Sequence, residues 1–138
     1  MIMNPTKITL AALAAAVGFA VAASAEDAKL PPAATKTGVT YATDMKALFD
    51  ASCVKCHSGD KPKARLKLDT LEGVLKGTKT GPIVKSGDSA NSVIIQAVAH
   101  LAKDKDTWMP PIPNKAGIKP LTPEEIGLIR AWIDQGAK

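Results

Sequence analysis

Aromatic side chains are scarce in this chain of 138 residues, and cysteine and histidine occur only twice each. After residue 25 the aromatic residues are Tyr41, Phe49, Trp108 and Trp132. Because so few large side chains do not fill the centre of a domain, we expect a group other than protein to contribute to the core. The composition also excludes a coiled coil and a multi-span membrane protein, and the length fits a single domain.

The first 25 residues have the order of an export signal. Lys7 precedes an uncharged run over residues 8–25, which ends in the small residues Ala23-Ser24-Ala25. A basic start, an apolar middle and small residues at the cut are typical of a secretory signal peptide. We therefore predict a signal peptide over residues 1–25 and a periplasmic location for the rest of the chain. An uncleaved membrane anchor is the alternative, because the uncharged run approaches the length of a short membrane span.

The remaining sequence predicts a small all-α domain over residues 43–138. Residues 26–42 hold two adjacent prolines and no apolar periodicity, which predicts a flexible N-terminal arm. Apolar residues at helical spacing predict three helices, over residues 43–53, 90–101 and 122–135. Thr43 or Asp44 is the expected cap of the first helix. The last helix has the clearest start, because Thr122, Pro123 and Glu125 form the pattern of a capping box.

Two segments rich in glycine, lysine and proline are predicted to form long irregular loops. Residues 58–88 contain only a brief apolar stretch, which indicates one or two short helical turns. Residues 103–121 contain four prolines, Pro110, Pro111, Pro113 and Pro120, which indicate an irregular but stiff segment.

The motif that carries chemistry is Cys53-Val54-Lys55-Cys56-His57. Two thiols three positions apart can each add to one of the two vinyl groups of a single porphyrin. The histidine that follows is then carried under the ring, where its imidazole can bind the iron. This spacing is the attachment signature of a c-type haem, so we predict one covalent haem c on Cys53 and Cys56 with His57 as an iron ligand. The haem would also supply the missing core, and we expect the chain without it to fold poorly.

Two alternatives use the same cysteines differently. A thioredoxin-like disulfide normally lies at the head of a helix in a strand-rich fold, whereas here a helix precedes Cys53 and little strand pattern exists. A structural zinc site needs four ligands, and only Cys53, Cys56, His57 and His100 are available. Their spacing is unlike that of a zinc finger.

The second axial ligand has three candidates after the signal peptide. Met45 lies one helical turn before Phe49, which is ordinary core spacing. Met109 lies in the proline-rich loop, which can reach the face of the iron opposite His57. His100 lies near the border of the apolar stripe of the second helix, and its ligation would lower the reduction potential relative to a His/Met pair.

With these residues in place, the chain resembles the class I c-type cytochromes, and most closely the planctomycete-type single-haem cytochrome c domain. The resemblance covers about residues 44–137. The matching stretches are residues 49–57, 66–70, 81–84, Gly87-Asp88 with Ser92, Trp108-Met109-Pro110-Pro111, and residues 121–137.

This resemblance implies a small helical domain wrapped around the haem, with His57 as proximal and Met109 as distal ligand. It implies a crossing of the first and last helices with Phe49 against Trp132, and a close approach of these helices at Gly127. It also suggests that the Pro82 carbonyl accepts a hydrogen bond from His57.

An iron held by two protein ligands has no free site for substrate, so we predict an exported carrier of single electrons, or the haem subunit of an oxidoreductase assembly, rather than an enzyme. Cations around the motif, from Lys55 to Lys67, indicate redox protein partners with acidic docking surfaces. Nucleic acid is not expected as a partner, and a membrane only through a partner or an uncleaved signal. The alternative function is a haem with an open or labile distal site, which acts on peroxide or senses a small gas.

Overall fold

The structure is a computed structural model that describes residues 29–138, so the predicted signal peptide over residues 1–25 lies outside the described residues. Within the described range the chain forms helices and loops, with an isolated bridge between Thr78 and Gly81 and no strand. The predicted all-α class is therefore confirmed. No helix in this part of the chain is long and apolar enough to cross a membrane.

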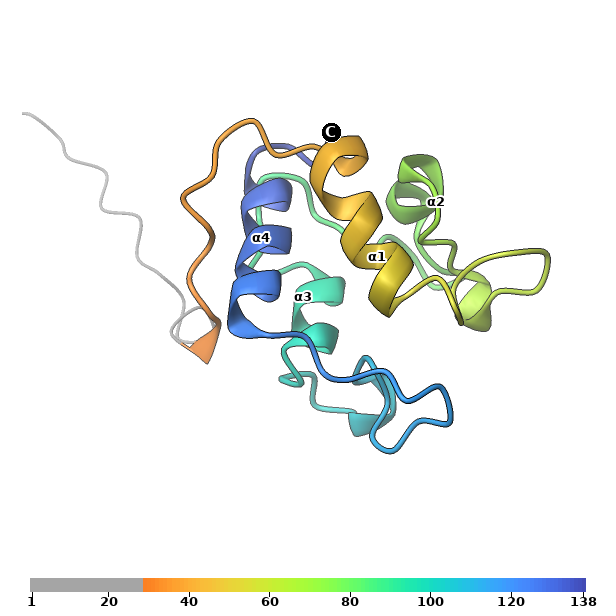
Figure 1. The fold of residues 1–138 in the computed structure, drawn as a ribbon. Helices are drawn as coiled ribbons and strands as arrows, with labels where there is room; N and C mark the ends of the chain where they lie inside the picture. Colours follow the sequence, from red (N-terminus) through yellow and green to blue (C-terminus); the bar gives the residue numbers. More distant parts are fainter. Residues whose placement is uncertain (1–28) are drawn as a thin grey trace, which may run out of the picture.

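The helices are short, and long loops connect them. The helical elements are η2 (Tyr41–Met45, a π-helical turn), α1 (Lys46–Ser52), η3 (Lys63–Arg65), α2 (Leu71–Lys76), α3 (Val93–Val98), η4 (Lys105–Thr107) and α4 (Pro123–Asp134). In Figure 1, α1 and α4 lie side by side, and α3 lies next to α4. In this view the loop that follows α1 extends to the right, and the segment between α3 and α4 extends downward.

Local sequence signals explain where the last helix begins and ends. The Thr122 side chain accepts from Glu125 N at 3.2 Å, and the Glu125 carboxylate accepts from Thr122 N at 2.8 Å, which is the predicted capping box. Gly136 ends the helix with a φ of +103°, which a residue with a Cβ rarely adopts.

The first helical segment begins earlier than predicted. Its cap is Thr40, whose hydroxyl accepts from Thr43 N at 3.2 Å, and not Thr43 or Asp44. Asp44 instead accepts from Thr40 N at 3.1 Å, and burial of Tyr41 draws the chain into the helix one turn sooner.

Three of the four aromatic residues after residue 25 pack together between the helices. The rings of Phe49 on α1 and Trp132 on α4 meet edge to face, with centroids 6.3 Å apart, which confirms the expected contact. Tyr41 lies 6.1 Å from Phe49 and donates a hydrogen bond to the Leu68 carbonyl at 3.0 Å. This aromatic cluster is part of a larger hydrophobic core, and it packs α1 against α4.

The described part of the predicted flexible arm, residues 29–42, lies against α4 instead of extending into solvent. Ala34 N donates to the Gly127 carbonyl at 2.8 Å, and the buried Arg130 donates from Nη1 to the Pro31 carbonyl at 2.6 Å. A Cβ on Gly127 would stand 2.6 Å from the Pro32 carbonyl oxygen. The glycine therefore allows a close approach of the arm, whereas the expected close approach was that of α1. Backbone hydrogen bonds of this kind leave no apolar period in the sequence, which explains the difference.

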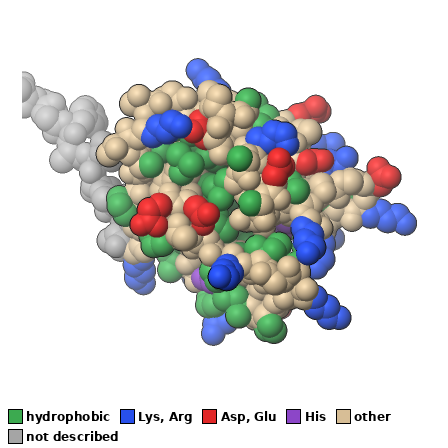
Figure 2. All heavy atoms as spheres, in the orientation of Figure 1, with side chains coloured by type: hydrophobic (Ala, Val, Ile, Leu, Met, Phe, Trp, Pro, Cys, Tyr) green, Lys and Arg blue, Asp and Glu red, His purple; other side chains and the backbone are tan. Residues whose placement is uncertain are grey.

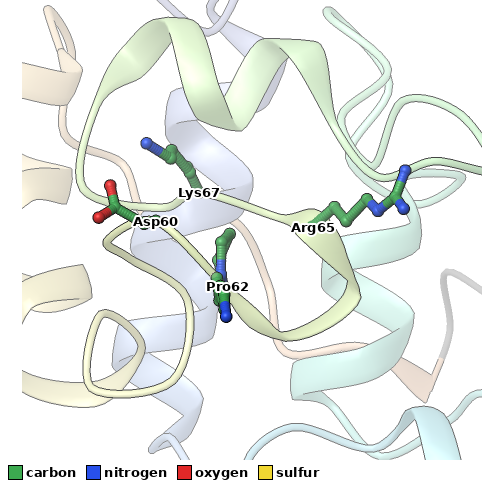
Figure 3. Close-up of a pocket in the computed structure, with 5 residues that line it drawn as sticks. Asp60, Pro62, Arg65 and Lys67 are labelled. Carbon is green, nitrogen blue, oxygen red and sulfur yellow. The ribbon is translucent and has the colours of Figure 1, made fainter.

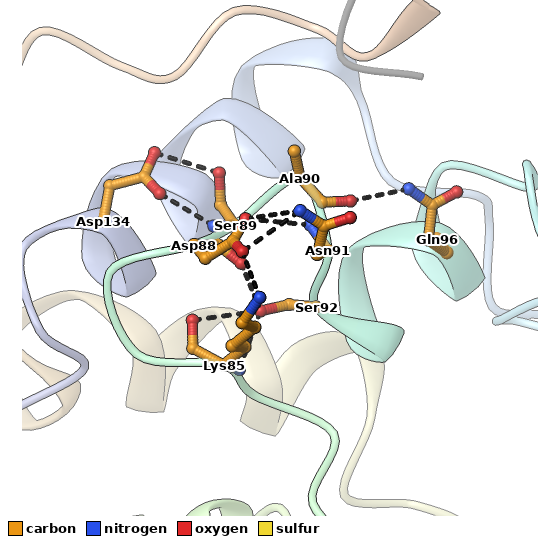
Figure 4. A network of polar contacts seen from close by, with 8 residues as sticks. All are labelled: Lys85, Asp88, Ser89, Ala90, Asn91, Ser92, Gln96 and Asp134. Atoms are coloured by element: carbon orange, nitrogen blue, oxygen red, sulfur yellow. Dashed lines mark hydrogen bonds and ion pairs between the residues drawn. The ribbon is translucent and has the colours of Figure 1, made fainter. Parts of the chain in front are cut away.

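The loop before α3 is held to the end of α4 by hydrogen bonds between Asp134 and the buried Ser89 (Figure 4). Asp134 accepts from both the amide and the hydroxyl of Ser89, at 2.8 and 2.9 Å. Ser92 accepts from Lys85 N at 2.9 Å and donates to the Asp88 carbonyl at 2.9 Å. Because these bonds shape residues 85–92 as a turn, α3 begins at Val93 rather than at residue 90, and it ends at Val98 rather than at residue 101.

Candidate haem site

The attachment motif occupies one helical turn at the end of α1. Cys53 N donates to the Phe49 carbonyl at 2.8 Å, and His57 N donates to the Cys53 carbonyl at 3.0 Å. This turn brings Cys53, Cys56 and His57 to the wall of the same cavity. Both cysteines are free thiols in the structure, and burial raises the pKa of Cys53 to about 12, so that thiol is neutral.

The imidazole of His57 is oriented by a backbone carbonyl. Its Nδ1 donates to the Lys63 carbonyl at 3.1 Å, so Nδ1 carries the proton and Nε2 keeps the lone pair that a metal ion requires. Burial lowers the pKa of His57, which favours the same neutral form. The acceptor is Lys63 and not Pro82, because residues 57–63 form a tight loop that returns the chain to the ring. A backbone carbonyl leaves no residue-specific signal, so the sequence could not have identified it.

The cavity has a volume of about 1080 Å³ and lies between helices and loops far apart in the chain. The described residues that line it include the motif, Met109 and a largely apolar set, namely Phe49, Leu66, Leu68, Ile83, Val93, Ile94, Ala97, Val98, Leu121 and Ile129. Val93 belongs to the apolar stripe predicted for its helix and yet is 56% exposed, because it faces this cavity. A large apolar space with two thiols, an imidazole and a thioether on its walls fits a c-type haem.

The three candidates for the second ligand occupy different places. Met45 is fully buried in the aromatic cluster, as core packing predicts. Met109 lines the cavity, and its backbone N–H is held by the Ala97 carbonyl at 3.1 Å. His100 does not line the cavity, and its Nε2 lies 3.2 Å from the Met109 carbonyl oxygen. Across residues 29–138 no cluster of three or more His, Cys, Asp or Glu side chains could hold a metal ion, so the four-ligand zinc set is not assembled there.

Part of the chain is similar to a known protein family. Residues 53–112 match the family described as Planctomycete cytochrome C, a segment that begins at Cys53 and includes Met109. This segment of the chain is therefore similar to the planctomycete-type cytochromes c. Neither the curated proteins nor the solved structures gave a significant match.

This match confirms the resemblance drawn from the residues. The family implies a covalent haem c, and Cys53 and Cys56 fit its attachment motif. A cytochrome c domain transfers electrons, whereas the catalytic alternative requires a free face of the iron. The family match covers residues 53–112, so the arm lies before it and α4 lies after it. The packing of the arm against α4 is therefore described by the structure and not by the family match.

Proposed function

We propose that this cytochrome is an exported mono-haem protein that carries single electrons between redox partners, with His57 and Met109 as the axial ligands. The observation that carries the proposal is that Cys53, Cys56, His57 and Met109 line one apolar cavity. A haem bound there supplies one-electron exchange between ferric and ferrous iron. The chain contains one Cys-x-x-Cys-His motif, which supports a single haem.

Each residue of the site has a distinct task in this proposal. The two cysteines form the thioether bonds, and the turn at the end of α1 keeps them on one side of the cavity. Nε2 of His57 binds the iron while the Lys63 carbonyl fixes the plane of the ring. The Met109 thioether, from the segment after α3, takes the second axial position. With both residues bound to the iron, the centre would exchange one electron with little rearrangement and would leave no free site for a substrate.

The experiment that tests this function is a visible spectrum of the oxidised and reduced protein, produced in a host able to attach haem. We expect a low-spin c-type spectrum, with the weak red band of a sulfur-to-iron bond in the ferric protein and slow binding of carbon monoxide to the ferrous protein. A c-type spectrum without that band, together with rapid binding of carbon monoxide, would contradict the ligand pair and favour the peroxide or gas-sensing function.

Export is also proposed, on the strength of the signal-like residues 1–25. A periplasmic cytochrome meets its donors and acceptors by diffusion, so the charge near the haem edge bears on partner choice. We propose partners whose docking surfaces are acidic. Five cations lie close to the attachment motif in sequence, and none forms an ion pair within the described part of the chain: Lys55, Lys61, Lys63, Arg65 and Lys67.

The geometry of these cations favours a broad surface over a small anion pocket. Asp60, Pro62, Arg65 and Lys67 surround a shallow depression, and the charged ends of Arg65 and Lys67 point to opposite sides (Figure 3). In Figure 2, Lys and Arg side chains stand around the hydrophobic side chains on the lower part of the molecule. Such an arrangement attracts an acidic protein over its whole face.

This surface predicts a salt-dependent reaction with anionic electron acceptors. The ferrous protein should reduce an anionic iron cyanide complex at a rate that falls as ionic strength rises, because salt screens the attraction. Lys61→Glu should lower that rate about threefold at low salt. Lys46→Glu makes the same change in net charge but removes a cation already paired with Asp50 at 2.7 Å, so its effect on the rate should be smaller. Stopped-flow measurements check this. Equal effects of the two variants, or a rate that rises with salt, would contradict the proposed surface.

A further inference from the structure

The predicted rival ligand, His100, has a different place in the structure. It follows α3 and adopts a left-handed backbone conformation, with a φ of +56°, which turns the chain back toward the helix. An L-residue adopts this conformation at a cost, so the surrounding contacts must hold it. Those contacts are with Trp108 and Met109, nine residues or fewer further along the chain.

The imidazole is held flat against the indole of Trp108. The two ring centroids lie 4.9 Å apart and the rings are within 3° of parallel. The indole is itself fixed, because Nε1 of Trp108 donates to the Ala102 carbonyl at 2.9 Å. Lys105 Nζ lies 5.4 Å from the centroid of the same indole. The stack therefore restricts tilting of the imidazole out of the plane parallel to the indole.

In that orientation Nε2 of His100 lies 3.2 Å from the Met109 carbonyl oxygen. A carbonyl only accepts, so Nε2 carries the proton in this contact. The N–H of Met109 is bonded to the Ala97 carbonyl at 3.1 Å. Both polar groups of the Met109 backbone are thus tied to residues at the end of α3, while the Met109 side chain lines the cavity.

We infer that His100 is a positioning residue for the distal ligand: it fixes the backbone of Met109 so that the thioether stays directed at the iron. This inference rests on the proposed ligation by Met109. The hydrogen bond restricts the loop over residues 103–118, in which Met109 lies in irregular chain just after the short turn η4. Release of the bond lets the thioether leave the iron more often, and external ligands then compete more effectively.

Two substitutions at His100 separate the hydrogen bond from the stacked ring. His100→Phe keeps an aromatic ring on Trp108 and loses the donor, whereas His100→Gln loses the ring and keeps a donor at a similar reach. The net worth of one such bond corresponds to about threefold to tenfold in an equilibrium constant. We expect His100→Phe to bind imidazole at the ferric iron about threefold to tenfold more tightly than wild type, and His100→Gln to remain closer to wild type.

A control distinguishes positioning from general loss of stability. Ser89→Ala removes hydrogen bonds to Asp134 and Arg130 on the side of α4 that holds the arm, away from the residues that line the cavity. It should lower the free energy of unfolding without changing the affinity for imidazole. Equal imidazole affinity in His100→Phe and wild type would overturn the inference, and so would an equal rise in His100→Phe and Ser89→Ala.

A measurement on the wild-type protein does not depend on how any variant folds. The nitrogen chemical shifts of His100 in the ferrous protein report which ring nitrogen is protonated, and the inference requires the Nε2–H form. Finding the proton on Nδ1 alone would overturn it. Failure of the proposed function looks different, because the wild-type spectrum would then lack the sulfur-to-iron band whatever the state of His100.

Discussion

Met109→Ala is expected to keep its covalent haem and lose its distal ligand. The thioether bonds depend on Cys53 and Cys56, which remain, so the protein should stay coloured. If the wild-type iron is free of its thioether about 0.1–10% of the time, removal of the thioether should tighten imidazole or cyanide binding about tenfold to a thousandfold. The reduction potential should fall as well, because thioether sulfur favours ferrous iron. Spectral titration and potentiometry measure these changes.

Met45→Leu is the matched control for that experiment. Met45 is fully buried in the aromatic cluster and does not line the cavity, and leucine has a similar volume. The spectrum and the ligand affinity of this variant should match those of the wild type. If Met109→Ala also matched the wild type, Met109 would not be the distal ligand. A shifted spectrum in Met45→Leu would instead point to Met45 as a ligand.

Cys53→Ala/Cys56→Ala is expected to yield a colourless chain without a cooperative thermal transition. The cavity of about 1080 Å³ occupies the space between α1, α3 and α4, and its apolar walls would face water in the absence of a bound group. Several residues of the hydrophobic core, among them Phe49, Ile94 and Ile129, also line this cavity, so one side of the core loses its contacts when the haem is absent. A domain of this size is stable by only about 5–15 kcal/mol, so loss of the contacts around the haem is enough to unfold it.

Circular dichroism during heating, with haem content measured on the same sample, checks this prediction. Cys56→Ala alone serves as the control, since one thioether bond and His57 remain to hold a haem. That variant should keep colour and a cooperative transition at a lower temperature. A sharp unfolding transition in the colourless double variant would show that the core does not need the haem.

Short-range signals in the sequence were sufficient for the chemistry and for parts of the fold. The attachment motif indicated the group and three residues proposed to bind it, and these three line one cavity because they are spaced along one turn. The capping box at Thr122 placed the start of α4 correctly, and the helical spacing of Met45 and Phe49 placed both in the core. In each case the interacting residues lie within about one turn, where the sequence pattern and the geometry carry the same information.

Other features were decided by contacts between residues far apart in the chain. The arm over residues 29–42 lies against α4 through backbone groups and Gly127. These contacts produce no apolar periodicity in the sequence, so the sequence pattern did not predict them. The partner of His57 is the carbonyl of Lys63, which any residue type could supply. The sequence favoured Met109 over its rival His100 as the second ligand, but only the fold shows that Met109 lines the cavity while His100 faces the Met109 carbonyl. The sequence by itself determined which chemical groups are present and how they are spaced along the chain. The tertiary structure determined which of these groups face one another, because loop closure brings together residues whose contact produces no periodic pattern in the sequence.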